Sequence, residues 1–283
     1  MINNPKVTTA AIPVILGWEA VKKHYSIETG SDSEWIVEAV TCIFLNTSVG
    51  FGLIDTGTSF PSRLSFSGSS NFYLLPQENT DPFRTALQNL DLDASEIHFA
   101  LLSHLHDDHA GNLEVFDNGF VRIFVSPKEL DFIKQHDESY LHKAGFDKAA
   151  LVKHSFLWSD LEKFDFGSIS PISTPGHTPG HCSFMIETTN IGDGGVVFCC
   201  DAADLSENIS DVKPPGICFG EKSEAKASLD KLISLAKCDK LTLIPGHDGR
   251  YWEELTTLHG MNCSGMTYLD ACALKEELID AHS

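Results

Sequence analysis

The stretch that decides how this chain folds and works is "LLSHLHDDHAGN", residues 101–112. It continues a short apolar run that starts at Ile97, which is typical of a strand covered on both faces. Three histidines and two aspartates then fall within six positions, 104–109. Loops that follow strands often carry binding and catalytic residues on a rigid scaffold, so we expect a functional site here.

The residue types in this loop favour a metal site. In extended backbone His104 and His106 point the same way, and a turn at 107–108 would bring Asp108 and His109 alongside them. Neutral imidazole and carboxylate are the usual ligands of zinc and similar metals. The alternative is a polar loop with surface histidines, but four potential ligands directly after a buried strand favour the metal.

The same pattern, an apolar strand followed by histidine or aspartate, recurs later in the chain. It occurs in "SISPISTPGHTPGH" with His177 and His181, in "GGVVFCCDAAD" with Asp201 and Asp204, and in "KLTLIPGHDG" with His247. Because each side chain follows the same end of its strand, we expect all of them to converge on one rim.

Strands and helices follow each other along the whole chain. Periodicity and turn residues predict strands at 35–47, 51–57, 97–104, 120–126, 168–174, 182–189, 194–200 and 240–248, and helices at 81–92, from Pro127, at 221–237 and near 265–279. Residues 10–16 read as a strand or a packing arm, and 138–165 as an inserted helical element or lid. So many strands favour a layered α/β fold with two stacked sheets.

Composition excludes several function classes. The 283 residues carry 40 acidic and 20 basic side chains, a net charge of −20 that argues against nucleic-acid partners. The eight cysteines include no CxxC pair, which indicates reduced thiols in a reducing compartment. With no signal peptide or membrane-spanning run in the sequence, we expect a cytoplasmic protein without a membrane partner.

Taken together, these motifs resemble the metallo-β-lactamase superfamily. Its HxHxDH signature stands here as residues 104–109, its later ligands match His177, Asp201 and His247, and "LIDTG" at 53–57 matches its strand and turn. The resemblance runs from about residue 35 to 250. It implies an αββα sandwich of two mixed β-sheets flanked by helices, formed by a single domain, 1–283, with lid insertions near 58–80 and 138–165.

The resemblance also implies a dinuclear metal centre. Its ligands would be His104, His106 and His177 for one metal, Asp108, His109 and His247 for the other, and Asp201 as the bridge. A metal-bridging hydroxide would attack the substrate, and Asp108 would pass a proton to the leaving group. The cofactors would be two divalent ions, most simply Zn²⁺, with Fe and Mn left open.

Three neighbours of these ligands receive other interpretations. Asp55 is expected to orient a ligand histidine instead of binding metal. His181 is expected to stabilise its turn or support the site, with contact to substrate or metal as the weaker alternative. Cys200 is expected to lie in the core.

Within the superfamily the chain is most similar to the quorum-quenching N-acyl-homoserine lactonases, through "SHLHxDHAGN", "TPGHTPGH" and the insertion after 57. This implies hydrolysis of a lactone, a small cyclic ester, by a monomer or homodimer. Another ester, an amide, a thioester or a phosphoester is the alternative substrate on the same site. A metal-binding module without activity and an iron redox protein are further alternatives.

Two positions depart from that pattern. Asp107 stands where the lactonases commonly have Phe, and Asp204 stands where they place a substrate-contacting Tyr. One hypothesis is that both aspartates bind a polar or cationic substrate. The equally weighted alternative is that Asp107 faces solvent or caps the next helix.

Overall fold

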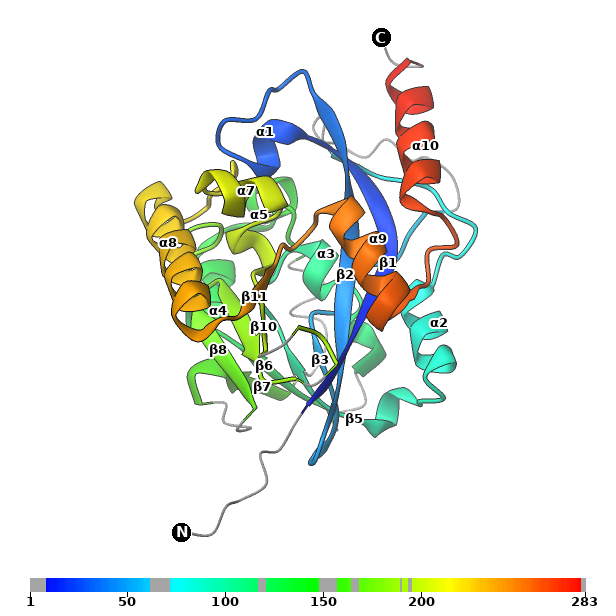
Figure 1. Cartoon of the computed structure of the whole chain (residues 1–283), viewed down its shortest axis with the longest axis vertical. Coiled ribbons are helices and arrows are strands. Elements are labelled where there is room, and N and C mark those ends of the chain that lie inside the picture. The colour runs from blue at the N-terminus through cyan, green and yellow to red at the C-terminus, as the bar shows by residue number, and fades with distance from the viewer. Residues whose placement is uncertain are drawn as a thin grey trace.

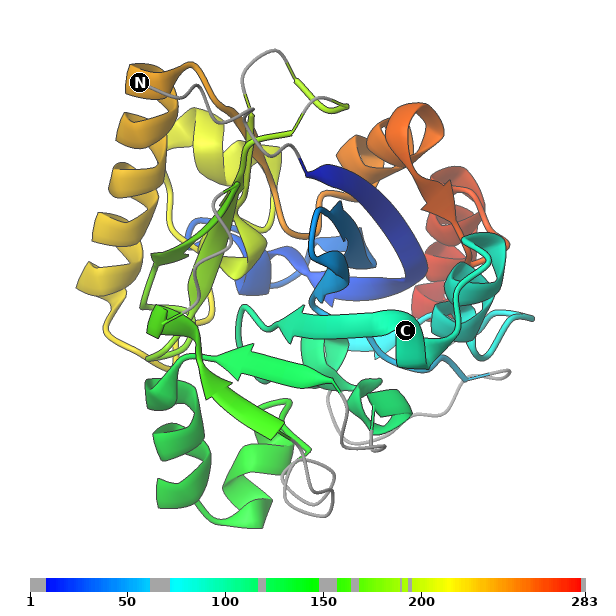
Figure 2. The ribbon, with the colours of Figure 1, turned by 90° about the horizontal axis from the view of Figure 1, so that it is seen from below.

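The strands of the protein form two mixed sheets that pack face to face, with helices on the outer faces (Figures 1 and 2). The computed structural model describes residues 9–61, 72–116, 121–147, 157–163, 168–188, 190–192 and 195–280. The predicted αββα sandwich is therefore confirmed.

The large sheet has the order β12-β1-β2-β3-β5-β6-β7, and β4 pairs with β1. Strands β1, β2 and β3 form an antiparallel meander, whereas β3, β5, β6 and β7 run parallel. Its strands are β1 (Ala10–Lys22), β2 (Trp35–Thr47), β3 (Gly50–Ile54), β4 (Phe72–Leu74), β5 (Ile97–Leu101), β6 (Arg122–Val125), β7 (Leu157–Asp160) and β12 (Met261–Asn262).

The small sheet has the order β11-β10-β9-β8. Its strands are β8 (Ile169–Ser173), β9 (Cys182–Ile186), β10 (Val196–Phe198) and β11 (Thr242–Ile244). Because β9 runs antiparallel to both β8 and β10, and β11 runs parallel to β10, the carboxyl ends of β8, β10 and β11 lie at the same edge. That edge is where the predicted ligands of this sheet follow their strands.

The helices connect these strands and cover them. The longer ones are α2 (Pro82–Asn89), α4 (Pro127–Gln135), α8 (Lys222–Asp239), α9 (Gly249–His259) and α10 (Tyr268–Asp280). The short ones are α1 (Lys23–Ser26), α3 (Asp107–Ala110), α5 (Glu138–Lys143), α7 (Ser206–Asp211), and the 3₁₀ turns η1 (Ala94–Glu96), η2 (Leu113–Phe116), η3 (Leu161–Lys163) and η4 (Cys200–Ala202).

Three apolar clusters account for the layers. One lies between the sheets, where Ile15 and Leu101 of the large sheet join Phe184 and Phe198 of the small one. A second joins the outer face of the large sheet to α2 and α4, and a third joins the outer face of the small sheet to α8, which Figure 2 shows along that face. Burying these faces from water supplies the main favourable free energy of folding.

The first strand is longer than predicted. The sequence predicted a strand or packing arm at 10–16, whereas β1 runs from Ala10 to Lys22. It contains a bulge between Ile15 and Gly17. Glycine is required there because a Cβ at Gly17 would lie 2.2 Å from the ring of Phe60.

Most predicted elements are confirmed. The helix at 82–89 is capped by Asp81, whose side chain accepts from the backbone N–H of Arg84. Helix α9 was not predicted. Within the predicted insertions, β4 pairs with β1 and β7 is an edge strand of the large sheet. A lid role for 62–71 and 148–156 stays a prediction, because these residues lie outside the described ones.

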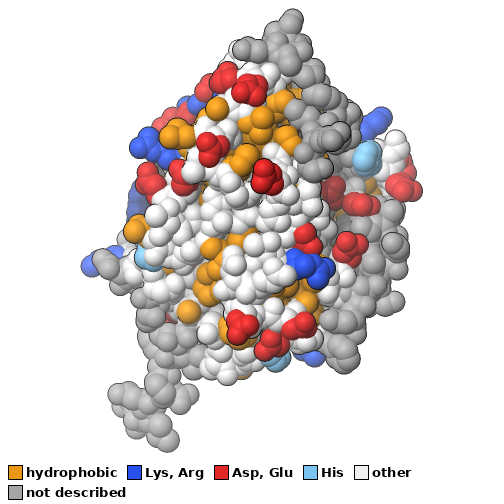
Figure 3. Space-filling model, turned by 90° about the vertical axis from the view of Figure 1, so that its right-hand side faces the viewer, with side chains coloured by type: hydrophobic (Ala, Val, Ile, Leu, Met, Phe, Trp, Pro, Cys, Tyr) orange, Lys and Arg blue, Asp and Glu red, His pale blue; other side chains and the backbone are white. Residues whose placement is uncertain are grey.

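The surface matches the acidic composition. Figure 3 shows acidic side chains spread over the face that carries α10 and α2, with fewer basic ones among the residues described. Within the described ranges, no helix is both long and apolar enough to span a membrane.

Candidate metal centre

The predicted ligands meet where the two sheets share an edge. The loop after β5 brings His104, His106, Asp108 and His109 from the large sheet, with Asp108 and His109 in the single turn of α3. The loops after β8, β10 and β11 bring His177, Asp201 and His247 from the small sheet. Their donor atoms form two groups, each within 4.8 Å, and Asp201 belongs to both.

The first group consists of His104, His106, His177 and Asp201. Nδ1 of His106 lies 2.8 Å from Nε2 of His104 and 2.9 Å from Nε2 of His177. Oδ2 of Asp201 lies 3.2 Å from Nε2 of His177 and 3.7 Å from Nε2 of His104. All four side chains are buried, so these donors face one another away from bulk water.

The second group consists of Asp108, His109, Asp201 and His247. Oδ1 of Asp201 lies 3.0 Å from Nε2 of His109 and 3.1 Å from Nε2 of His247. Oδ2 of Asp108 lies 3.2 Å from Nε2 of His109 and 3.8 Å from Nε2 of His247. Asp108 is the member that reaches solvent, because its side chain is 24% exposed.

The protonation states of the histidines in the first group leave lone pairs that could bind a cation. Nδ1 of His177 donates to the carbonyl oxygen of Ile217, so its Nε2 carries a lone pair. His106 has one proton at most on Nδ1 while neutral, yet this atom contacts two ring nitrogens. Burial, the largest effect, followed by His177, lowers the pKa of His106 to about 3, so the ring is neutral. Several lone pairs thus converge on a point where a positive ion would satisfy them all.

Electrostatics keeps the carboxylates of the cluster ionised. Burial alone would raise the pKa of Asp201, but His109 and His247 outweigh it and hold the pKa well below the usual value. Burial would likewise lower the pKa of His109, but Asp108 and Asp201 outweigh it and raise the pKa. Both effects reflect carboxylates and imidazoles that compensate one another at close range.

Asp55 fixes the orientation of His109, in the manner expected from the sequence. Its Oδ2 accepts from Nδ1 of His109 at 2.8 Å and from the hydroxyl of Ser103 at 2.8 Å, while Oδ1 accepts from the backbone N–H of Ser103 at 2.7 Å. Asp55 and Cys200 both adopt positive φ, 54° and 47°, next to the cluster. Backbone strain of this kind costs free energy and collects at functional sites.

His181 supports Asp201 through the backbone. Its Nε2 accepts from the N–H of Asp201 at 3.1 Å, and Nδ1 donates to the carbonyl oxygen of Thr174 at 3.1 Å. Burial lowers the pKa of His181 to about 3, so the ring stays neutral and keeps this acceptor. The geometry thus gives His181 a supporting position, as the sequence suggested.

Glu129 of α4 ties two ligand loops together, and the sequence analysis missed it. Its Oε1 accepts from the hydroxyl of Thr178 at 2.5 Å and from the N–H of Gly180 at 2.7 Å, and the N–H of Leu105 also favours its charge. Burial nevertheless raises its pKa to about 7. The available signal was a charged residue at helical spacing from the buried Phe132 and Ile133.

The two donor groups have different neighbours. Beside the first group, Phe146 and Phe219 pack on His106, with ring centroids 4.2 and 5.3 Å away. Beside the second group lie Glu19 of β1 and Glu38 of β2, which are directly opposed across the strand pair. The cluster therefore adjoins apolar rings on one group and additional carboxylates on the other.

Asp204 belongs to the same acidic surroundings. It is 5% exposed, its carbonyl oxygen accepts from the N–H of His247 at 2.8 Å, and its Oδ1 has no hydrogen-bond partner among the described residues. Burial, then the charges of Asp201 and Glu38, raise its pKa well above the usual value. The sequence analysis named Asp204 but not Glu19 or Glu38, although each is a lone acid in an apolar strand.

Asp107 has a different setting. Its side chain is exposed and accepts from the backbone N–H of Asp147 at 2.9 Å, and its own N–H donates to Gly145. These contacts hold the turn after α5 against α3, which agrees with the solvent-facing alternative. A contact between Asp107 and substrate stays a prediction.

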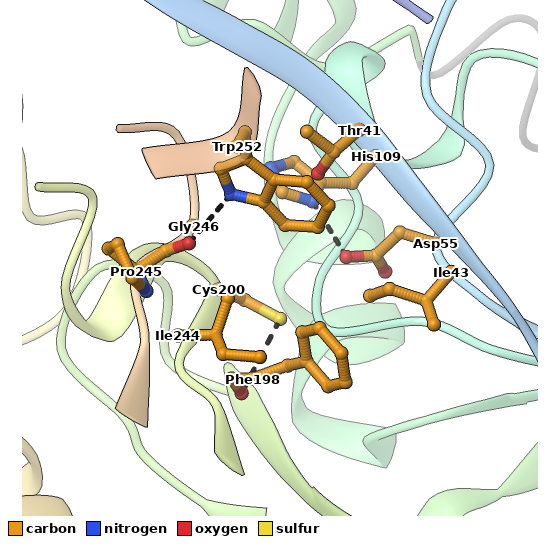
Figure 4. A pocket seen from close by; sticks show the side chains of 10 residues that line it. All are labelled: Thr41, Ile43, Asp55, His109, Phe198, Cys200, Ile244, Pro245, Gly246 and Trp252. Carbon is orange, nitrogen blue, oxygen red and sulfur yellow. Dashed lines mark hydrogen bonds and ion pairs between the residues drawn. The ribbon is translucent and has the colours of Figure 1, made fainter. Parts of the chain in front are cut away.

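A cavity of about 10 Å³ lies behind the cluster, lined by His109, Asp55, Cys200 and Trp252 among others (Figure 4). It is at the lower limit for one water molecule, far too small for a substrate. Cys200 points into the core here, as expected, and Trp252 donates to the carbonyl oxygen of Pro245 at 2.8 Å. This region packs the ligand loops and does not bind substrate.

Curated relatives of this chain include N-acyl homoserine lactonases. An N-acyl homoserine lactonase from a Bacillus species is 30% identical over 215 residues, covering 74% of this chain and 81% of the relative. The N-acyl homoserine lactonase of Bacillus thuringiensis is 29% identical over 217 residues with the same coverage. AttM of Azorhizobium caulinodans is 27% identical over 215 residues, covering 72% of this chain and 79% of the relative.

Solved structures share the fold. A variant of Bacillus thuringiensis AiiA with N-decanoyl-L-homoserine at its active site gives a TM-score of 0.72 at 24% identity, covering 86% of this chain and 94% of that one. The dizinc quorum-quenching lactonase AidC gives 0.57 at 17% identity, covering 86% and 92%. A family model described as the metallo-beta-lactamase superfamily matches residues 35–247. The sequence, the two sheets and this match agree, and the chain belongs to the metallo-beta-lactamase superfamily.

Proposed function

We propose that the protein is a dinuclear metal-dependent hydrolase that opens a lactone. The observation that carries this proposal is the pair of donor groups that share Asp201. We assign His104, His106 and His177 to one ion, Asp108, His109 and His247 to the other, and Asp201 to both. The lactonase relatives support a cyclic ester as substrate, and another ester, an amide, a thioester or a phosphoester is the alternative.

Two divalent ions in these groups would polarise the ester carbonyl and lower the pKa of water bound to them from 15.7 to about 7. The chain's own residues position the donors and move the proton. Asp108 is suited to proton transfer because it is ionised and solvent-accessible: burial would raise its pKa, but His109 outweighs this and lowers it. In the reaction, water adds to the carbonyl carbon and the ring C–O bond breaks. Asp108, ionised at the start, takes up one proton of this water and passes it to the leaving oxygen. The products are an alcohol and a carboxylic acid, which loses its own proton to the solvent.

We also propose the finer features that the sequence suggested. Zinc is the favoured metal because imidazole and carboxylate suit it, and the neighbour AidC is a dizinc enzyme, while Fe and Mn remain alternatives. A reducing, cytoplasmic setting is supported by the eight cysteines, because none of them forms a disulfide. The protein would act as a monomer or homodimer on a small molecule.

The test combines metal analysis with a substrate panel. Purified protein should contain two divalent ions for each chain and hydrolyse acylated homoserine lactones, and chelation should abolish turnover until metal is restored. The panel should include a linear ester, a thioester and a phosphotriester to decide the substrate class. Full turnover after complete chelation, or hydrolysis of the phosphotriester alone, would contradict the lactonase proposal.

A further inference from the structure

Three carboxylates lie buried beside the metal cluster without an ion-pair partner among the described residues. Glu19, Glu38 and Asp204, here called the acidic cluster, are 7%, 4% and 5% exposed. None forms an ion pair with any residue that the structure describes. A carboxylate buried without an ion-pair partner is either costly when ionised or takes up a proton, so a cationic ligand would stabilise its ionised form.

The positions of Glu19 and Glu38 increase the free-energy cost of ionising them. Glu19 and Glu38 are opposed across antiparallel strands, where side chains on one face lie about 5 Å apart and like charges repel. Oε1 of Glu38 and Oδ1 of Asp204 are fully buried and accept no hydrogen bond from the described residues. Oδ1 of Asp204 is therefore an acceptor without a donor among the described residues, whereas the nearby hydroxyl of Ser26 favours the charge of Glu38.

Binding of a further metal ion does not explain the cluster. Within the described part of the chain, the potential ligand groups are the two that share Asp201, and neither includes Glu19, Glu38 or Asp204. A protonated amine is better suited, because it needs several acceptors at hydrogen-bonding distance and a compensating negative charge, without a close ligand shell.

We propose that Glu19, Glu38 and Asp204 bind a cationic group, such as a primary ammonium, on the substrate. The inference rests on the proposed function, since it places this group beside a lactone held at the metal cluster. Glu19 and Glu38 interact electrostatically with Asp108 and His247 of the second donor group. The rings of Phe146 and Phe219 lie beside the first donor group. A substrate with a charged end and an apolar part matches both neighbourhoods.

The test compares two lactones of equal length on the metal-loaded protein. N-(6-aminohexanoyl)-homoserine lactone carries an ammonium where N-heptanoyl-homoserine lactone carries a methyl group. We expect kcat/KM to favour the ammonium substrate by about tenfold, the effect of 1.4 kcal/mol, mainly through KM. Glu38→Gln and Asp204→Asn should each remove most of this preference. The control Glu34→Gln removes an exposed carboxylate four positions from Glu38 and should leave the ratio unchanged.

Three outcomes would overturn the inference. The first is lactone hydrolysis without preference for the ammonium substrate, which leaves the proposed function standing. The second is equal loss on both substrates together with loss of bound metal in Glu38→Gln, which would make the acidic cluster a charge balance for the ions. The third applies if neither lactone is hydrolysed, and it is equal affinity for the two lactones in calorimetry. If calorimetry instead shows tighter binding of the ammonium lactone, and Glu38→Gln abolishes this difference, the site is supported although the proposed function fails.

Discussion

The metal cluster and the acidic cluster are adjacent groups of buried polar side chains, yet their surroundings differ. In the metal cluster, Asp55, the carbonyl of Ile217 and the backbone of Ala39 each hold one ligand ring in place. In the acidic cluster, Glu38 and Asp204 each keep a buried oxygen that accepts no hydrogen bond from the residues described. The metal cluster is therefore preorganised by hydrogen bonds within the chain, whereas the acidic cluster has oxygens that a bound ligand could contact.

This difference separates two kinds of functional residue. Preorganised ligands keep the same geometry through every turnover, so their supporting hydrogen bonds raise metal affinity. Residues that select a substrate must remain unsatisfied until it arrives, and they lower the stability of the free protein. Substitutions in the two clusters should therefore change stability in opposite directions.

The largest effect is expected at the residue that both donor groups share. Asp201→Ala removes the bridging carboxylate and leaves the two sets of imidazoles without a common anion. Hydrolysis should fall on the order of 10³-fold or more, and bound metal should decrease. Metal analysis and kcat/KM on the same sample check this, with the exposed Asp211→Asn as the control. Two retained ions and normal turnover would break the assignment of Asp201 to the metal cluster.

A smaller loss should follow when a supporting group is weakened. Asp55→Asn keeps an acceptor for Ser103 or His109 but removes the charge that orients His109. Metal affinity should fall by about 10- to 100-fold while the fold remains. Competition with a chromogenic chelator measures this. An unchanged affinity would mean that the ligand rings are held by packing alone.

The third prediction concerns Glu129, whose hydrogen bonds hold the ligand loops and whose ionisation should make stability depend on pH. Burial raises its pKa from 4.5 to about 7, so the folded state binds this proton more tightly than the unfolded state does. The free energy of unfolding should therefore fall as pH rises from about 4.5 to about 7, by on the order of 3 kcal/mol. Glu129→Gln should gain stability relative to wild type over this range. Denaturant unfolding at pH 5 and pH 8 checks it, and a gap between the two proteins that does not change with pH would contradict it.

The smallest effect is expected at Glu38, and it is a gain in the free energy of unfolding instead of a loss of activity or metal affinity. Its pKa is raised to about 7, chiefly by burial, so its ionised form is penalised in the folded protein and the penalty grows as pH rises toward 7. Glu38→Gln should stabilise the protein at pH 8 by about 1 kcal/mol, less than Glu129→Gln because bound cations offset part of the repulsion. Thermal unfolding of metal-loaded samples measures this. Destabilisation would show that the carboxylate has a structural partner after all.

The sequence predicted the ligand set because the ligands follow recognisable strands at fixed spacing. His104 to His109, His177, Asp201 and His247 each come after an apolar run, and parallel strand ends meet at one edge. Helix α9 was missed although its buried residues Trp252, Leu255 and Thr256 have helical spacing. Glu19, Glu38 and Glu129 were missed because a charge inside an apolar run gives no indication of what it will face. That depends on contacts with residues far away in the sequence, such as Thr178 for Glu129 and Asp201 for Glu38.

The ligands also come from both layers of the sandwich, from β5 in the large sheet and from β8, β10 and β11 in the small one. A pair of ions bound by these residues would cross-link the two sheets, as a disulfide cross-links segments of a secreted domain. Since a ligand that binds only the folded state stabilises it by mass action, the lifetime of this protein in a cell should follow the local supply of free metal.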